Sequence, residues 1–135
     1  MEKVRILLAG LGRMGQSHAS NLVHSIPEAE VVAVCSIVQE ELDWAKKNLG
    51  VQNLYQDFDK MVDEKKGEAD AVYLVTSTDQ HARGIIKGLE SGLHVFCEKP
   101  LGISIKECLE VEEVSKKYPD LNVTLGFVRR YDPSY

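Results

Sequence analysis

The segment HVFCEKPLG, residues 94–102, joins a buried-strand pattern to two charged residues and a proline. Residues 95–97 are apolar, but Glu98 and Lys99 follow directly, and charges at the end of a hydrophobic strand cost desolvation energy unless they are used. Pro100 biases Lys99 toward an extended backbone conformation, so the direction of the lysine side chain is restricted. Ligands of open α/β sheets bind at the carboxyl ends of strands. The segment therefore predicts a lysine that contacts a ligand. The alternative is a lysine at the end of a strand that simply extends into water.

The glycine-rich stretch GLGRMG is the second candidate site. Gly10, Gly12 and Gly15 stand in GxGxxG register directly after a strand-like segment. The first glycine permits a tight turn, the second lets a pyrophosphate approach the backbone, and the third lets helix and strand pack closely. Free N–H groups at the start of the following helix favour a phosphate there. With Arg13 and Met14 inside the turn, the pattern predicts dinucleotide binding. A purely structural turn and an adenosine cofactor such as S-adenosylmethionine are the alternatives.

The choice of cofactor depends on the end of the second strand. The fingerprint expects an acidic residue about 20 positions on, where it binds the ribose hydroxyls. That place falls in AVCSIVQEE and holds Ser36, which accepts a 2′-phosphate that a carboxylate would repel. Ser36 therefore favours NADP or the use of both cofactors, but no Arg or Lys follows it nearby, as an NADP site normally requires. The choice between NAD and NADP stays open, and Glu40 and Glu41 are expected on the next helix.

Strand-like and helix-like segments alternate along the chain. Short, β-branched apolar runs predict buried parallel strands at 4–10, 30–35, 70–76, 94–98 and 122–127, with a weaker one at 53–56. Helical patterns are predicted at 14–26, 40–49 and 79–91, the last two ending at Gly50 and Gly92. Capping boxes are predicted for Ser77 with Gln80 and for Ser104 with Glu107. This order predicts an α/β fold: a doubly wound parallel (Rossmann) sheet with helices on both faces.

Composition excludes several classes of protein. The chain has 135 residues, enough for one domain with its own core, and a net charge of −5 that argues against nucleic acid. No apolar run approaches the ~20 residues of a membrane span. Cys35, Cys97 and Cys108 lack CxxC spacing, so we interpret them as reduced thiols of a cytoplasmic protein. The histidines show no metal-ligand pattern, and no metal site is expected.

Four separated motifs in one order carry a family resemblance. GLGRMG, VTSTDQHA, EKP and GFVRRYDPSY resemble the Gfo/Idh/MocA oxidoreductases, in particular their inositol 2-dehydrogenase-like members, over the entire chain. EKP together with GFVRRYDP is the most specific part. There are two departures from the family pattern. The usual TP after the fourth strand is Thr76–Ser77 here, and Ser36 replaces the acidic residue.

The resemblance implies roles for individual residues. Lys99 would hold and polarise the substrate hydroxyl, and Glu98 would lie by the nicotinamide ribose. Thr76, Ser77 and Thr78 would line the cofactor, and Arg129 would reach a polyol. His81 matches a family histidine at the cofactor, although a role in starting or packing its helix fits equally well. His18 would contact the phosphates or pack beside the first turn. Tyr131 and Asp132 would serve the substrate pocket or shape the exit from the domain.

The resemblance also implies a second domain. In this family the first domain binds NAD(P), and a second α/β domain completes the substrate site with an aspartate and a histidine. We therefore expect a dinucleotide-binding domain at 1–126 and the start of a crossing segment at 127–135, with the substrate domain absent. The chain would be the cofactor half of a longer, homo-oligomeric enzyme and inactive alone.

The leading hypothesis is an NAD(P)-dependent dehydrogenase that oxidises a secondary alcohol of a sugar or cyclic polyol, inositol-like, by hydride transfer. The alternative is a non-catalytic dinucleotide-binding redox sensor, which needs no polarising cation at the nicotinamide end. Lys99 separates the two. A methyltransferase gives no reason for the EKP motif.

Overall fold

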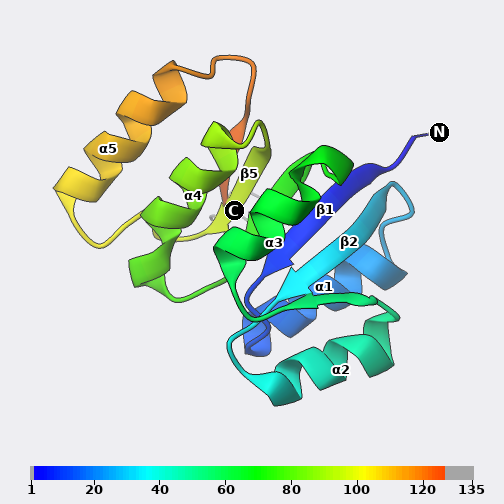
Figure 1. The fold of residues 1–135 in the computed structure, drawn as a ribbon. Helices are drawn as coiled ribbons and strands as arrows, with labels where there is room; N and C mark the ends of the chain where they lie inside the picture. Colours follow the sequence, from blue (N-terminus) through cyan, green and yellow to red (C-terminus); the bar gives the residue numbers. More distant parts are fainter. Residues whose placement is uncertain (1, 127–135) are drawn as a thin grey trace, which may run out of the picture.

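The computed structural model describes residues 2–126, which form one six-stranded parallel sheet in the order β3-β2-β1-β4-β5-β6 (Figure 1). The strands are β1 (Val4–Ala9), β2 (Ala29–Cys35), β3 (Asn53–Tyr55), β4 (Ala71–Leu74), β5 (His94–Glu98) and β6 (Val123–Gly126). The helices are α1 (Arg13–His24), α2 (Gln39–Leu49), α3 (Phe58–Lys65), α4 (His81–Glu90) and α5 (Ile105–Lys116). Short 3₁₀ turns precede β4 at Lys66–Glu68 and α4 at Thr78–Gln80.

Helices cover both faces of the sheet (Figure 1). One apolar core packs α1 and α2 against Ile6, Leu8 and Val34. The other packs α3, α4 and α5 against alternate strand residues such as Val72 and Val95. Since side chains alternate along a strand, a sheet covered on both faces needs apolar residues at nearly every position. The predicted doubly wound α/β fold is confirmed.

The ends of the helices agree only partly with the sequence analysis. Gly50 ends α2 in the left-handed conformation, as predicted. Ser104 caps α5 by accepting a hydrogen bond from the Glu107 amide at 3.2 Å. The capping box predicted for Ser77 is wrong, because Ser77 precedes a 3₁₀ turn and makes no side-chain capping bond. The hydroxyl of Ser77 instead bonds the carboxylate of Asp79, and this bond lowers the pKa of Asp79.

Helix α3 was not predicted from the sequence. It has eight residues and begins after Asp57, whose side chain accepts a hydrogen bond from the Lys60 amide at 3.2 Å. Met61 and Val62 are its buried residues. Two core residues in eight give too weak a periodic pattern to stand out in a sequence.

Residues 2–126 contain neither a membrane-spanning helix nor a cluster of metal-binding side chains. No helix in this range is long and apolar enough to cross a membrane. Within the same residues, no group of three or more His, Cys, Asp or Glu side chains lies close enough together to hold a metal ion.

The three cysteines differ in exposure. Cys35 and Cys97 are buried at the ends of β2 and β5, whereas Cys108 is partly exposed on α5. Burial raises the pKa of the Cys35 thiol to about 11 and that of Cys97 to about 12. Since the thiolate is the reactive form, both buried thiols are expected to be inert near neutral pH.

We therefore expect one fast and two slow thiols when the folded protein meets a disulfide reagent at about pH 8. Cys108 should react at least about 100-fold faster than the other two, because it alone of the three is partly accessible. The change in thionitrobenzoate absorbance measures the rates. Cys108→Ser should remove the fast phase, and equal rates for three thiols would contradict the described core.

Candidate cofactor and active site

Gly10 and Gly15 bring the glycine turn into direct contact with neighbouring backbone. Gly10 has φ +98°, and a Cβ there would lie 2.3 Å from the carbonyl oxygen of Val75. A Cβ on Gly15 would lie 1.9 Å from the carbonyl oxygen of Gly10. Gly12 is different, since a Cβ there would meet nothing within 4 Å. Two glycines are thus required by the protein itself, and the third leaves space for a ligand.

The N-terminus of α1 is open to an anion. Gly12 precedes the helix with no side-chain cap, and the first turn contains no acidic residue. The Gln16 amide donates to the Gly12 carbonyl at 2.8 Å. The amides of Arg13, Met14 and Gly15 come before that first helical bond and have no helical acceptor. Arg13 and Met14 are exposed. This end of the helix can therefore hold a pyrophosphate.

Backbone hydrogen bonds join the strand ends around this turn. The Gly10 amide donates to the Cys35 carbonyl at 2.9 Å, and the Val75 amide donates to the Ala9 carbonyl at 2.8 Å. Strand β5 lies beside β4 in parallel register, with Leu74 opposite Cys97. The residues that follow β1, β2, β4 and β5 therefore lie along one edge of the sheet. They include the glycine turn, Ser36, Thr76–Thr78 and Glu98–Lys99.

Thr76 has a buried hydroxyl at this edge. Its Oγ1 is buried and makes no hydrogen bond with any other described residue. A buried polar group without a partner costs free energy, so such an atom at a ligand-binding edge fits a ligand that supplies the bond. Ser77 is exposed, and Thr78 begins the 3₁₀ turn before α4.

His81 connects two loops from inside the protein. Its side chain is 1% exposed, with Nδ1 2.7 Å from the Pro100 carbonyl and Nε2 3.0 Å from the Thr76 carbonyl. Carbonyls only accept, so a neutral ring donates to one of them and a protonated ring to both. His81 therefore positions the loop after β4 against the loop after β5. Contact between this ring and the cofactor stays a prediction.

His18 holds Glu98 from the other face of the sheet. The ring projects from α1, and its Nε2 lies 2.8 Å from Oε1 of Glu98. Phe96 and Tyr73 stack with ring centroids 4.2 Å apart, and His18 lies 5.6 Å and 5.7 Å from their respective centroids. Because side chains alternate along a strand, Phe96 and Glu98 share this face. The imidazole thus binds the carboxylate next to Lys99.

Lys99 is exposed between two fixed neighbours. His18 binds Glu98 before it, and His81 binds the carbonyl of Pro100 after it. Within residues 2–126, no hydrogen bond or ion pair occupies the Lys99 ammonium. The ammonium is thus available to a ligand at the strand end. Arg129, Tyr131 and Asp132 lie outside the described residues.

Ser36 is buried and carries an acidic partner. Its Oγ donates to Oε1 of Glu41 at 2.6 Å and accepts from the Val38 amide at 3.1 Å. Glu40 and Glu41 lie on α2 as expected, but Glu41 reaches back to the end of β2. The carboxylate of Glu41 therefore lies next to Ser36, the residue at the position where the fingerprint expects an acid.

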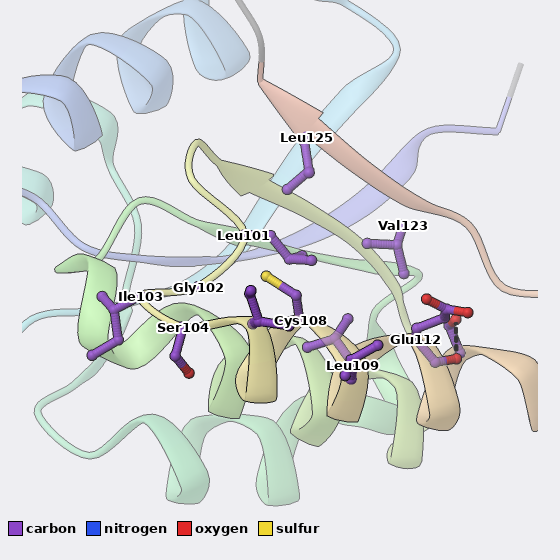
Figure 2. Close-up of a pocket in the computed structure, with 12 residues that line it drawn as sticks. Leu101, Gly102, Ile103, Ser104, Cys108, Leu109, Glu112, Val123 and Leu125 are labelled. Carbon is purple, nitrogen blue, oxygen red and sulfur yellow. Dashed lines mark hydrogen bonds between the residues drawn. The ribbon is translucent and has the colours of Figure 1, made fainter.

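A hollow of about 630 Å³ lies between α5, β6 and the loop after β5 (Figure 2). Its lining includes Leu101, Ile103, Cys108, Leu109, Val123 and Leu125. Among the described residues that line it, Glu112 is the one acid, and none is a lysine, arginine or histidine. The hollow lacks the paired polar groups that acid–base chemistry needs, so we place the candidate site at the strand ends.

Two functional contacts were missed in the sequence. His18 and Glu98 are 80 positions apart, and neither position indicates the other. The Ser36–Glu41 contact is local, but an acid in the first turn of a helix usually indicates only a favourable helix dipole. A search for acids in the first turn of the helix that follows the expected position could have found it.

Comparisons with known proteins agree with the geometry. The chain matches a family model described as "Oxidoreductase family, NAD-binding Rossmann fold" over residues 4–127. The scyllo-inositol 2-dehydrogenase (NAD(+)) of Bacillus subtilis is 36% identical over 133 residues, which cover 98% of this chain and 38% of that protein. The myo-inositol 2-dehydrogenase of Thermotoga maritima is 34% identical over 132 residues, with the same two coverages.

Solved structures give the same result. The scyllo-inositol dehydrogenase from Lactobacillus casei, with bound cofactor NAD(H) and scyllo-inositol, has a TM-score of 0.95 and 41% identity. The match covers 99% of this chain and 39% of that one. The myo-inositol 2-dehydrogenase from Lactobacillus plantarum has a TM-score of 0.95 and 40% identity. The present chain thus spans about two fifths of the length of these relatives.

The three glycines should separate stability from binding. Gly12→Ala should lower the free energy of unfolding by about 1 kcal/mol at most, the cost of alanine at the N-cap of α1, because the added methyl meets no protein atom. It should still weaken NADH binding at least tenfold by filling the space of the pyrophosphate. Gly15→Ala should cost roughly 2 kcal/mol or more, because its methyl meets the Gly10 carbonyl.

Denaturant titration gives the stabilities, and NADH fluorescence gives the affinities. Equal destabilisation by the two substitutions would show that Gly12 is required by the fold rather than by a ligand.

Proposed function

This chain belongs to the Gfo/Idh/MocA family of oxidoreductases and corresponds to its NAD-binding Rossmann domain, and from that premise we propose an NAD-dependent dehydrogenase. Its substrate would be a secondary alcohol of a cyclic polyol or sugar. The relatives named above act on inositols, and one of them was solved with scyllo-inositol bound. The proposal extends that substrate class to this protein.

One observation carries the proposal. An open anion site at α1 and the Glu98–Lys99 pair lie along the same edge of the sheet, on the glycine turn and the end of β5. A cofactor whose pyrophosphate lies on the glycine turn would extend along that edge toward the lysine. A redox sensor has no need of a free ammonium at that end, so this arrangement favours the enzyme.

The residues of the edge fit the cofactor. Gly12 leaves open space, and the hydroxyl of Thr76 has no partner among the described residues. In the proposed complex Gly10, Gly12 and Gly15 surround the pyrophosphate, with Arg13 and Met14 at its rim. Thr76, Ser77 and Thr78 line the nicotinamide half, and His81 holds their loop in place. When bound, the nicotinamide supplies an acceptor for the hydride of the carbinol carbon.

Lys99 would act on the alcohol oxygen. Its ammonium would donate a hydrogen bond to that oxygen and stabilise the negative charge that develops as the hydroxyl proton passes to the aspartate or histidine expected in the second domain. Two unit charges about 4 Å apart attract by roughly 4 kcal/mol at an effective dielectric near 20, but by about 1 kcal/mol in water. The lysine therefore contributes most when the substrate and the rest of the site exclude water.

Glu98 would bind the ribose next to the nicotinamide. One carboxylate oxygen is held by His18 at 2.8 Å, which fixes the side chain without using its other oxygen. That second oxygen is available to accept from a ribose hydroxyl. Arg129, outside the described residues, is proposed to contact the polyol, and the whole protein is proposed to be a homo-oligomer.

The 135-residue chain should bind NADH by itself, because the glycine turn and the loops after β4 and β5 all lie within it. Calorimetry or NADH fluorescence should show saturable binding. The same chain should turn over no inositol, because in our proposal a second domain completes the substrate site. Steady NADH production from inositol by these residues alone would refute that division.

Lys99→Ala should separate binding from chemistry. In the protein expressed from its complete reading frame, we expect kcat for inositol to fall at least about 100-fold, since the donor to the alcohol oxygen is lost. The Kd for NADH should stay within about twofold. Lys106→Ala, which removes an exposed lysine from α5, is the matched control and should leave both values unchanged. Full activity of Lys99→Ala would remove the lysine from the mechanism.

A further inference from the structure

Glu41 is held in a single position by a buried serine. The Ser36 hydroxyl has one proton, and the Glu41 carboxylate at 2.6 Å is its closest acceptor. That distance is typical of a charge-assisted bond from a hydroxyl to an ionised carboxylate. The Val38 amide, which donates to Ser36 Oγ at 3.1 Å, fixes the orientation of the hydroxyl.

This position lies beside the glycine turn. The Gly10 amide donates to the Cys35 carbonyl at 2.9 Å, and Ser36 is the next residue. The Ser36 amide is bound in turn by the Tyr55 carbonyl at 2.9 Å. The ribose of a dinucleotide bound at such a turn lies at the end of the second strand. The Glu41 carboxylate therefore reaches, from the first turn of α2, the place where an acidic residue at the end of β2 would stand.

The free oxygen of Glu41 suits a ribose. Oε1 is bound by Ser36, while Oε2 makes no hydrogen bond with another residue of the described range. No arginine or lysine of that range forms an ion pair with Glu41, so no basic side chain neutralises its charge. Ile37, which follows Ser36, is 87% exposed and offers an apolar surface for an adenine ring.

From these contacts we propose that Glu41, positioned by Ser36, binds the adenosine ribose hydroxyls and selects NAD(H) over NADP(H). The inference rests on the proposed cofactor site. A carboxylate accepts from the 2′- and 3′-hydroxyls of NAD(H) and repels the 2′-phosphate of NADP(H). The Ser36 hydroxyl cannot donate a hydrogen bond to that phosphate at the same time, since its one proton is already donated to Glu41. The preference for NADP that the serine suggests in the sequence is thereby reversed.

The test compares Glu41→Gln with Glu40→Gln. Both remove one negative charge from the first turn of α2, but Glu40 is exposed, and the side-chain hydrogen bonds of Ser36 in the described residues go to Val38 and Glu41. NADH and NADPH affinities are measured by fluorescence titration of the 135-residue chain, and circular dichroism confirms folding. Wild type should bind NADH at least tenfold more tightly than NADPH. Glu41→Gln should reduce that ratio at least fivefold, chiefly by tighter NADPH binding, and Glu40→Gln should leave it within twofold of wild type.

Two further measurements make the result specific. Ser36→Ala leaves the Glu41 charge but removes its anchor, so the ratio should fall between those of wild type and Glu41→Gln. Added salt should lower the ratio of NADH affinity to NADPH affinity more in wild type than in Glu41→Gln, because salt screens the electrostatic repulsion of the 2′-phosphate.

The outcomes distinguish this inference from the proposed function. Wild type that binds NADH and NADPH equally, or Glu41→Gln that behaves as Glu40→Gln does, would overturn the role of Glu41 and leave the cofactor site intact. Binding of neither nucleotide would overturn the proposed cofactor site, and this inference with it.

Discussion

Direct contact between backbone groups at the glycine turn determines where everything else lies. Gly10 meets the Val75 carbonyl and Gly15 meets the Gly10 carbonyl, at distances that leave no room for a side chain. Strand β1, strand β4 and helix α1 are therefore joined at one point without a spacer. The free amides of α1 stand directly over the strand ends as a result. A bulkier residue at either glycine would move the helix and its anion site away from the residues after β4 and β5.

Much of the fold could be predicted because buried parallel strands leave a strong local signal. Runs such as VRILLAG and HVFCE are apolar at almost every position, since both faces of the sheet are covered. Helix α3 was missed because it buries only two residues. Ser77 was assigned to a capping box from spacing alone, whereas the chain there forms a 3₁₀ turn and its hydroxyl bonds Asp79 instead. Spacing cannot separate these two local solutions.

The candidate site was predictable in its parts but not in its connections. The glycine turn, Thr76, Glu98 and Lys99 carry motifs, and their location after strands brings them to one edge. Two of the contacts that orient them join segments far apart in the sequence, His18 with Glu98 and His81 with Pro100. The contact of His81 with Thr76 is local, but no motif indicates it. Glu41 shows the same limit at short range. Its position in the sequence indicates a helix start, and only the turn at Val38 returns its carboxylate to Ser36.

Two histidines bind the residues on either side of Lys99, while the Lys99 side chain itself stays free to move. His18, on α1, binds the side-chain carboxylate of Glu98 on one face of the sheet, and His81, on α4, binds the backbone carbonyl of Pro100 on the other. The four methylene groups of the Lys99 side chain can still change rotamer, and fixing such a side chain costs up to about 2 kcal/mol of conformational entropy. That cost falls on whichever molecule immobilises the ammonium. In the proposed dehydrogenase that molecule would be the alcohol, and its hydrogen bond to the ammonium would have to offset this cost.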